Sequence, residues 1–360
     1  MPTSLLICDD STMARKQVAR SLPDGWDVDV TFATNGVEAI AAIKAGKGDI
    51  LLLDLNMPKM DGYQVLETIL KQDLPTLTIV ISGDIQPEAH QRVKGLGALD
   101  FIKKPVDKSK LTEVLIAFGV FSKEDLIIAE NEAAKLINQS TGPIKSASVI
   151  KPAVAAAQQS IIKIDSEMID CYKEITNVAM GQAGDLLARL LDVVVVLPIP
   201  NVNLIEVSEL TMALSDVENK DETSGICQGF IGAGISGEAL LILNDSSFKD
   251  IASLMKYEHK FDNNVELELL MDMANVLIGA CLTGIAEQLD MSFSQGHPVV
   301  LGQHRKISEL IAINTNKWKK TLAIEISYSI ENYPIKFDLL LLFTEQSLAV
   351  LNHKIAYLLD

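Results

Sequence analysis

The sequence is poor in positive charge, with 31 Lys and Arg against 48 Asp and Glu, and its formal net charge is −17 at pH 7. Nucleic acids and anionic membrane surfaces are bound by clustered basic side chains, so neither is an expected partner. No uninterrupted apolar run reaches the roughly 18 residues of a membrane span, and the N-terminus lacks the pattern of a signal peptide. We therefore expect a cytoplasmic protein without membrane insertion.

Cysteine and histidine are also scarce. The four cysteines and five histidines are scattered, and no CxxC pair occurs. This spacing argues against a disulfide framework, and it offers neither a zinc site nor a nucleophile with a neighbouring base. The 360 residues, 48% of them hydrophobic and 22% charged, are instead typical of two or three globular domains with buried cores.

Five short apolar runs alternate with amphipathic segments of helical spacing in the first 120 residues. The predicted strands cover residues 4–8, 28–32, 50–53, 76–81 and 99–102. The predicted helices lie near residues 12–22, 36–45, 64–72, 87–94 and 108–118. Strict alternation predicts a doubly wound α/β domain with a five-stranded parallel sheet, in which ligands bind at the carboxyl ends of the strands.

Chemically distinctive residues fall at those strand ends: Asp9 and Asp10 after the first strand, Asp54 after the third, Ser82 after the fourth and Lys104 after the fifth. Three carboxylates held together repel one another and attract a hard divalent cation, for which Mg²⁺ is suited. One carboxylate can then accept a phosphoryl group whose charge is neutralised by the cation, the lysine and the hydroxyl. Helix caps and surface acids are the alternative, but they leave the Lys-Pro after the fifth strand unexplained.

These residues, together with the run Met57-Pro58-Lys-Met-Asp61-Gly62, resemble the receiver domain of bacterial response regulators, which has a flavodoxin-like fold. The resemblance implies that Asp54 is the phosphoacceptor and that a histidine kinase is the phosphodonor. It implies four Mg²⁺ ligands: Asp9, Asp10, Asp54 and the backbone carbonyl of Asn56. It also implies that Ser82 and Lys104 contact the phosphoryl group, that Phe101 replaces the switch aromatic, and that Lys104–Pro105 is a cis peptide bond.

A connector over residues 121–165 is expected between this domain, residues 1–120, and a second domain, residues 166–360. Ser122-Lys-Glu-Asp-Leu has the N-cap and acidic first turn of a helix, and helical spacing continues to Ile137. Residues 145–160 are rich in Ala, Ser and Gln, which favours a mobile linker.

A weak internal repeat runs through residues 166–360. Two motifs recur 98 positions apart: Glu174-Ile-Thr-Asn177 with Asp272-Met-Ala-Asn275, and Pro200 with Pro298. The repeat divides the domain into halves of about 166–262 and 263–360. Duplicated α/β halves usually pack about a pseudo-twofold axis, so we expect one two-lobed α/β domain.

Each half opens with a predicted long helix, over 166–191 in the first and 264–289 in the second. Two acids and an Asn stand at i, i+4 and i+7 of each helix and therefore share one face: Asp170, Glu174 and Asn177, then Glu268, Asp272 and Asn275. A carboxylate beside an amide provides neither a catalytic nucleophile nor a complete set of metal ligands. It can, however, bind the lysine of a partner while the amide orients a water.

This spacing, followed by 22 residues and Pro, resembles the CheC/CheX/FliY family of chemotaxis phosphatases. The resemblance implies that Glu174 engages a receiver lysine and that Asn177 orients the water that attacks an aspartyl phosphate. Asp272 and Asn275 would form a second centre. Asp272 stands where glutamate is usual, which shortens the reach by about 1.5 Å and predicts a weaker centre. Solvated acids on a helix face are the alternative.

The sequence therefore predicts a phosphatase of phosphorylated response regulators that is regulated by its own receiver domain. Two alternatives stay open: a docking module that binds phosphorylated receivers without hydrolysing them, and a phosphatase whose substrate is its own Asp54. A DNA-binding output is disfavoured by the charge and by the lack of a helix-turn-helix pattern. Homodimer formation and binding of a CheD-like regulator are left open.

Overall fold

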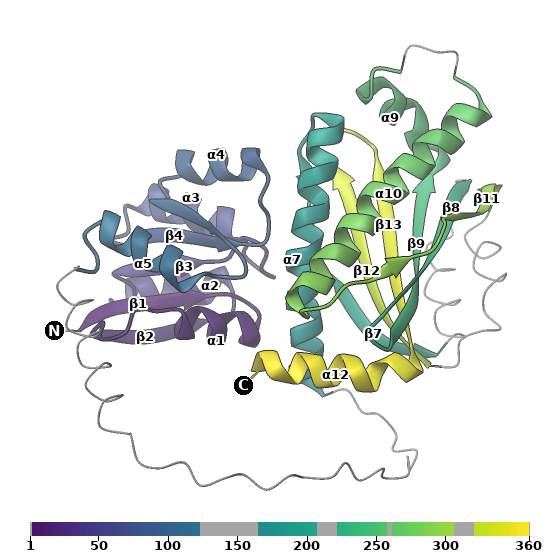
Figure 1. Ribbon diagram of the computed structural model, residues 1–360. Coiled ribbons are helices and arrows are strands. Elements are labelled where there is room, and N and C mark those ends of the chain that lie inside the picture. Colours follow the sequence, from purple (N-terminus) through teal and green to yellow (C-terminus); the bar gives the residue numbers. More distant parts are fainter. Residues whose placement is uncertain (1, 123–164, 207–221, 258–260, 306–319, 360) are drawn as a thin grey trace, which may run out of the picture.

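The computed structural model describes residues 2–122, 165–206, 222–257, 261–305 and 320–359. Two domains lie side by side, with the N-terminal one in purple to blue and the C-terminal one in teal to yellow (Figure 1). The predicted connector, including its helix and linker, lies almost wholly outside the described residues.

The N-terminal domain is a five-stranded parallel sheet with helices on both faces. Its elements are β1 (Thr3–Cys8), α1 (Thr12–Arg20), β2 (Val28–Ala33), α2 (Gly36–Lys44), β3 (Ile50–Leu53), α3 (Gly62–Gln72), β4 (Leu77–Ser82), α4 (Pro87–Gly95), β5 (Asp100–Lys103) and α5 (Lys108–Ala117). The strand order is β2-β1-β3-β4-β5, and every pair is parallel. Each predicted strand and helix is confirmed, with ends that differ by two residues at most.

The central strands are buried on both faces of this sheet. In β3, Leu51 and Leu53 belong to the core on one face and Ile50 and Leu52 to the core on the other, as the two-residue period of a strand requires. Four helices begin where a side chain accepts a first-turn backbone N–H: Ser11, Asn35, Asp61 and Asp107. Both cores consist wholly of residues from this domain, so we expect residues 1–122 to fold on their own.

The C-terminal domain is an eight-stranded antiparallel sheet with two long helices on one face. Its elements are α7 (Ser166–Leu191), β6 (Val195–Val196), β7 (Asn201–Glu206), β8 (Thr223–Gly232), β9 (Ile235–Asn244), η1 (Asp245–Ser247), α9 (Phe248–Leu254), α10 (Asn263–Gln288), β10 (Ser294–Gln295), β11 (Val299–Arg305), β12 (Lys320–Ile330), β13 (Lys336–Thr344) and α12 (Glu345–Leu359). The helices α7 and α10 start and end within one residue of the predicted ranges.

The strand order of this sheet is β10-β8-β9-β13-β12-β6, with β11 also beside β8 and β7 also beside β12. The order is symmetric: when each strand of the first half is exchanged for its counterpart in the second half, the same order is obtained from the other end of the sheet. The strands β9 and β13 pair at the centre, whereas β7 of the first half pairs with β12 of the second and β11 of the second half pairs with β8 of the first. Each half therefore completes the sheet of the other.

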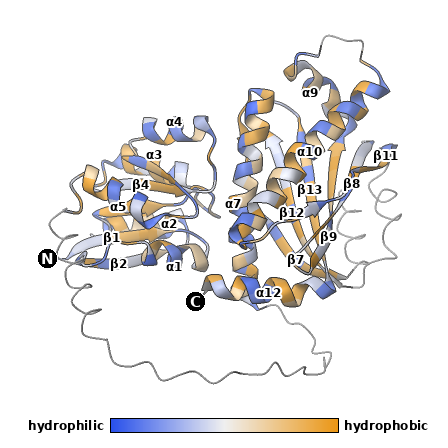
Figure 2. Ribbon diagram, in the orientation of Figure 1, coloured by the Kyte–Doolittle hydropathy of each residue, from blue (hydrophilic) through white to orange (hydrophobic). Residues whose placement is uncertain are grey.

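Helix α10 is long and apolar enough to cross a membrane by composition, with a mean hydropathy of 1.8 in its most apolar window. However, 61% of that window is buried, and the helix packs with α7 and the sheet in the largest hydrophobic core. In Figure 2 the facing strands β9 and β13 are mostly orange, which is the hydrophobic colour. Helix α10 is therefore part of the hydrophobic core of this domain. The four cysteines are free and buried.

His304 on β11 links the two halves of the C-terminal domain. Its Nδ1 lies 2.7 Å from Asp245 Oδ2 of the first half, and its Nε2 lies 3.3 Å from Glu266 Oε2 of the second. The hydrogen bond to Asp245 raises the pKa of His304 above its ordinary value of 6.5.

A base whose pKa is higher in the folded state than in the unfolded state stabilises the fold at low pH. The stabilisation is fully present below pH 6.5 and is lost as the pH rises through the raised pKa of His304. Because the pair is partly exposed, we expect an effect of about 0.5–1 kcal/mol, or about 2 °C in Tm. His304→Gln should remove this part of the pH dependence in thermal melts of the full chain. The exposed His297→Gln serves as the control, and an unchanged pH dependence in His304→Gln would contradict the prediction.

Candidate functional site at the domain interface

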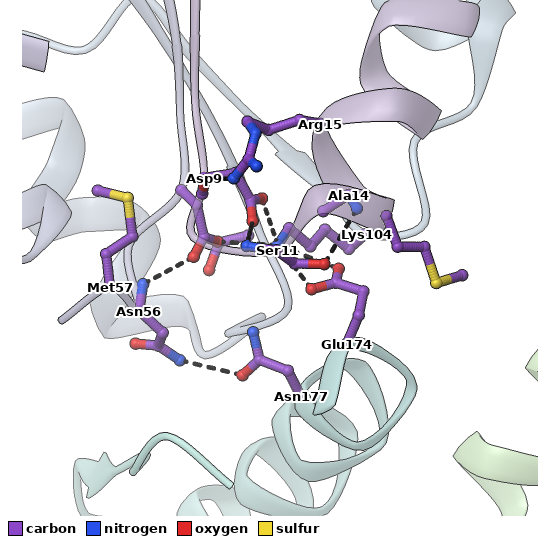
Figure 3. A network of polar contacts seen from close by, with 12 residues as sticks. Asp9, Ser11, Ala14, Arg15, Asn56, Met57, Lys104, Glu174 and Asn177 are labelled. Carbon is purple, nitrogen blue, oxygen red and sulfur yellow. Dashed lines mark hydrogen bonds and ion pairs between the residues drawn. The ribbon is translucent and has the colours of Figure 1, made fainter. Parts of the chain in front are cut away.

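One lysine contacts three carboxylates where the two domains meet. Lys104 Nζ lies 2.7 Å from Asp9 Oδ2, 3.2 Å from Asp54 Oδ1 and 3.1 Å from Glu174 Oε1. All four side chains are at least 94% buried. Asp9, Asp54 and Lys104 follow β1, β3 and β5, so the parallel sheet brings their strand ends together, whereas Glu174 comes from α7 (Figure 3). Lys104 thus joins the candidate site of one domain to that of the other.

The two oxygens of Asp54 have different surroundings. Oδ2 accepts a hydrogen bond from the backbone N–H of Asn56 at 3.1 Å. Oδ1, which faces the ammonium of Lys104, accepts no hydrogen bond of ordinary geometry from the described residues. Burial raises the pKa of Asp54, and the nearby positive charge of Lys104 opposes this increase. The two oxygens therefore differ: Oδ2 is bound by the backbone, and Oδ1 is left to the ionic contact with Lys104.

A candidate cation site consists of Asp9, Asp10 and Asp54, each of which offers a carboxylate oxygen within 4.8 Å of the others. Burial, and next the charge of Asp9, raise the pKa of Asp10 to about 6. Buried acids that repel one another in this way are stabilised by a divalent cation, and an all-oxygen donor set suits Mg²⁺. The three carboxylates therefore fit Mg²⁺; the fourth predicted ligand, the carbonyl of Asn56, stays a prediction.

Helix α7 presents Glu174 and Asn177 to this acidic site. Figure 3 shows both side chains projecting from the helix toward Lys104 and Asn56. Asn177 Oδ1 accepts a hydrogen bond from Asn56 Nδ2 at 3.5 Å, and the two α7 side chains are only 5% and 7% exposed. Burial raises the pKa of Glu174, while Lys104 lowers it. Glu174 therefore binds Lys104, and the amide of Asn177 lies against Asn56 in the loop that follows Asp54.

A small cleft lies between the two domains beside Asn177. Its volume is about 20 Å³, which is enough for roughly one water molecule. The lining residues are Asp10, Ser11, Asn56, Asp170, Lys173, Glu174, Asn177, Ile199 and Pro200. The polar atoms that a water needs as partners are therefore present.

Further contacts fix α7 on the N-terminal domain at the start of α1. Asp170 Oδ2 accepts hydrogen bonds from the backbone N–H of Met13 at 3.1 Å and from Ser11 Oγ at 3.2 Å. A carboxylate is favoured at a helix N-terminus because of the free N–H groups there. The side chain of Met13 is 3% exposed and belongs to the hydrophobic core of the C-terminal domain. Asp170 and Met13 thus anchor one end of the interface.

The other end is held through backbone atoms. Gln86 donates to the carbonyl of Val195 at 2.8 Å and accepts from its N–H at 2.9 Å. The carbonyl oxygen of Gly83 lies only 1.8 Å from where a Cβ on Gly181 would stand. The two backbone segments therefore approach more closely than a residue with a Cβ at position 181 would allow. This interface therefore requires glycine at position 181.

Not all predicted residues meet at this site. Ser82 is fully buried, and its Oγ accepts the N–H of Asp84 at 3.1 Å. The ring of Phe101 packs edge-to-face on His90 of α4, with 5.5 Å between the ring centroids. Asp272 and Asn275 lie on α10, and Asn275 is exposed. The predicted cis peptide bond at Lys104–Pro105 is confirmed.

Asp170→Ala removes the acceptor that binds the start of α1. We expect the docking of the two domains to weaken by about 1–2 kcal/mol, because hydrogen bonds to a charged group are lost. This raises the undocked population about 5- to 30-fold, which hydrogen exchange at the amide of Val195, a donor to Gln86 across the interface, can measure. The control is Glu167→Ala, which removes an exposed ion pair with Lys16 from the same interface and should matter less. Equal exchange in both variants would contradict the role of Asp170.

Comparison with known proteins covers mainly the N-terminal domain. A family model, the response regulator receiver domain, matches residues 5–116. The chemotaxis protein CheY of Treponema pallidum is 36% identical over 115 residues, which are 31% of this chain and 79% of that protein. A protein-glutamate methylesterase/protein-glutamine glutaminase of Geobacter sulfurreducens is 38% identical over 102 residues, 28% of this chain and 27% of its own length. The chain thus spans about a quarter of the methylesterase.

Among solved structures, FliY of Thermotoga maritima is similar with 19% identity and a TM-score of 0.40, covering 54% of this chain and 99% of that chain. The family match over residues 5–116 covers almost the whole of the five-stranded parallel sheet. Through its N-terminal domain, this chain belongs to the response regulator receiver family.

Proposed function

We propose that this chain is a response-regulator phosphatase that hydrolyses the aspartyl phosphate on its own Asp54. The observation that carries the proposal is the contact between the two domains. Glu174 binds Lys104 at 3.1 Å, and Asn177 lies against Asn56 beside a cleft with room for one water. These are the acid and the amide that the sequence predicts for the first centre, and they contact Lys104 and Asn56 beside Asp54, the predicted phosphoacceptor of the same chain.

The chemistry requires little beyond alignment. In the phosphorylated chain, Lys104 neutralises charge on the phosphoryl oxygens, and Glu174 holds the lysine in place. Mg²⁺ held by Asp9, Asp10 and Asp54 would supply further positive charge. Asn177 orients a water so that its oxygen forms a bond to phosphorus while the bond to the Asp54 oxygen breaks. Asp54 leaves as a carboxylate, and the protons of the water stay with the inorganic phosphate or pass to solvent.

The C-terminal domain has features that support a CheC/CheX/FliY-like phosphatase. The acid and Asn motifs recur on α7 and α10, and the strand order reads the same from both ends, as a pseudo-twofold domain requires. We therefore propose domains at 1–120 and 166–360, joined by the connector, in a cytoplasmic chemotaxis protein with a histidine kinase as phosphodonor. The similarity of the receiver domain to a chemotaxis protein agrees with this.

The contact between the domains favours Asp54 as substrate over the other hypotheses. A receiver that acted only as a regulatory input would not need Glu174 in contact with Lys104 and Asn177 in contact with Asn56, both beside Asp54. A docking module without catalysis would need no water cleft beside Asn177. Hydrolysis of a separate receiver requires a second site, because the first is occupied by the receiver of the same chain.

The test follows phosphate loss from the full chain. The protein is phosphorylated with a small-molecule phosphodonor in Mg²⁺, the donor is removed, and the acyl phosphate is followed over two orders of magnitude in protein concentration. We expect a first-order rate constant that does not change with concentration. A rate constant that rises with concentration would indicate hydrolysis between molecules, and a phosphate as persistent in wild type as in Glu174→Gln would indicate docking without catalysis.

A further inference from the structure

Docking of the two domains adds a carboxylate to a site that already holds more acids than bases. The N-terminal domain contributes Asp9, Asp10, Asp54 and Lys104, and α7 adds Glu174. With every acid ionised, three carboxylates and one ammonium give a net charge of −2, and Glu174 changes it to −3. Asp9, Asp54 and Glu174 each place an oxygen within 3.2 Å of the lysine nitrogen, so these oxygens lie within about 6.5 Å of one another and repel.

The other charged side chains beside the site change this difference little. Arg15 donates to the backbone carbonyl of Asp9, but it belongs to the N-terminal domain and is present whether or not the domains are docked. Asp170 and Lys173 of α7 both line the interdomain cleft, and their charges have opposite signs. Glu174 is 5% exposed, so water and salt screen its charge only weakly. Repulsion between Glu174 and the acids of the N-terminal domain therefore opposes docking.

Lys104 offsets only part of this repulsion, because three carboxylates share its single positive charge. A divalent cation at Asp9, Asp10 and Asp54 would bring the net charge of the N-terminal side of the site from −2 to zero. The ammonium of Lys104 is then left to pair with Glu174. Asp54 Oδ1 can still coordinate such a cation, because its residue is 1% exposed and this oxygen accepts no hydrogen bond of ordinary geometry from the described residues.

We infer that a divalent cation bound by Asp9, Asp10 and Asp54 strengthens the docking of the two domains through the charge of Glu174, and that docking in turn strengthens binding of the cation. The two effects are one coupling, since a ligand that favours one state of a protein is bound more tightly by that state. The cation concentration then sets how much of the chain is docked. Glu174 thus acts in the unphosphorylated chain as well, apart from the hydrolysis proposed above.

The first experiment measures the affinity of the unphosphorylated full chain for Mg²⁺ by isothermal titration calorimetry at constant ionic strength. We expect the full chain to bind Mg²⁺ at least fivefold more tightly than the free N-terminal domain, residues 1–122. Gly181→Leu, whose side chain would collide with Gly83 while Glu174 is retained, should bind Mg²⁺ as weakly as the free domain. Equal affinities of the full chain and the free domain, or weaker binding by the full chain, would overturn the inference.

Glu174→Gln separates the charge of this side chain from its shape. We expect the Mg²⁺ affinity of this variant to fall to within about twofold of that of the free domain, although its domains stay docked without Mg²⁺, as small-angle X-ray scattering can show. The control Glu167→Gln removes an acid whose ion pair with Lys16 is exposed, and it should keep the affinity of wild type. Wild-type Mg²⁺ affinity in Glu174→Gln, or separated domains in this variant, would show that the charge of Glu174 does not couple docking to the cation.

Hydrogen exchange at the amide of Val195, which donates to Gln86 across the interface, measures the same coupling from the other side. Mg²⁺ should slow this exchange at least fivefold in wild type, whereas KCl at the same ionic strength should not. Exchange that Mg²⁺ does not slow would contradict the inference. None of these measurements involves hydrolysis, so a stable phosphate on Asp54 would refute the proposed catalysis alone, and an Mg²⁺ affinity that does not depend on docking would refute the coupling alone.

Discussion

Replacing Asn177 with alanine is expected to prolong the lifetime of the phosphoryl group on Asp54 by about 10²-fold or more, the usual cost of removing one polar group that is aligned with the transition state. The amide is 7% exposed and borders the cleft that has room for one water. Alanine leaves that water without its partner, while Lys104, Glu174 and the cation site are untouched. The measurement is the decay of acyl phosphate in the full chain after removal of the phosphodonor.

Two comparisons make this result specific. Asn177→Asp keeps the shape of the side chain but places a negative charge beside the phosphoryl group, and we expect it to be no faster than Asn177→Ala. Asn264→Ala removes an exposed amide at the start of α10 and should leave the decay unchanged. A decay in Asn177→Ala that matches wild type would show that Asn177 does not orient the attacking water.

Replacing Gly181 with leucine is expected to separate the two domains. The first atom of the new side chain would stand 1.8 Å from the carbonyl oxygen of Gly83, and all three of its nearest atoms are backbone atoms that cannot rotate away. The contacts of Lys104 with Glu174 and of Gln86 with Val195 would be lost together, because they depend on the same approach. We expect the phosphoryl lifetime in this variant to equal that of the free domain, residues 1–122.

Small-angle X-ray scattering measures the separation directly, as an increase in the radius of gyration of the full chain. The control is Gly95→Leu, which introduces the same side chain at a helical position with nothing within 4 Å of its Cβ. The thermal unfolding of the receiver domain should persist in Gly181→Leu, since the interface lies outside both receiver cores. A compact Gly181→Leu chain with rapid phosphate loss would contradict the docked arrangement.

Local patterns predicted the receiver domain almost completely. The strand β3, with its Ile-Leu-Leu-Leu run, and the caps at Ser11 and Asp61 are determined by neighbours in the sequence, so their ends could be located within two residues. The proximity of Asp9, Asp54 and Lys104 was predictable because the carboxyl ends of parallel strands lie at one edge of a sheet. The acid and amide on α7 were also predictable, since residues at i and i+3 share a helix face.

The arrangement of the domains could not be predicted in this way. Met13, Gln86 and Gly83 have no local pattern that marks them as contacts for α7, and their partners lie more than 90 residues away. Which receiver faces the first centre therefore depends on tertiary packing alone. The sequence could only leave open whether Asp54 is a control input or a substrate, and the contact of Lys104 with Glu174 favours the second.

The exchange of β7 and β11 between the halves of the C-terminal domain has a consequence for how this chain can evolve. Neither half can be deleted, because each would take with it a strand that the other needs. The second half is therefore retained as scaffold whatever happens to its own motif, and changes such as aspartate at position 272 can accumulate without loss of the fold. A duplicated site of this kind can acquire a new partner while the original one continues to work.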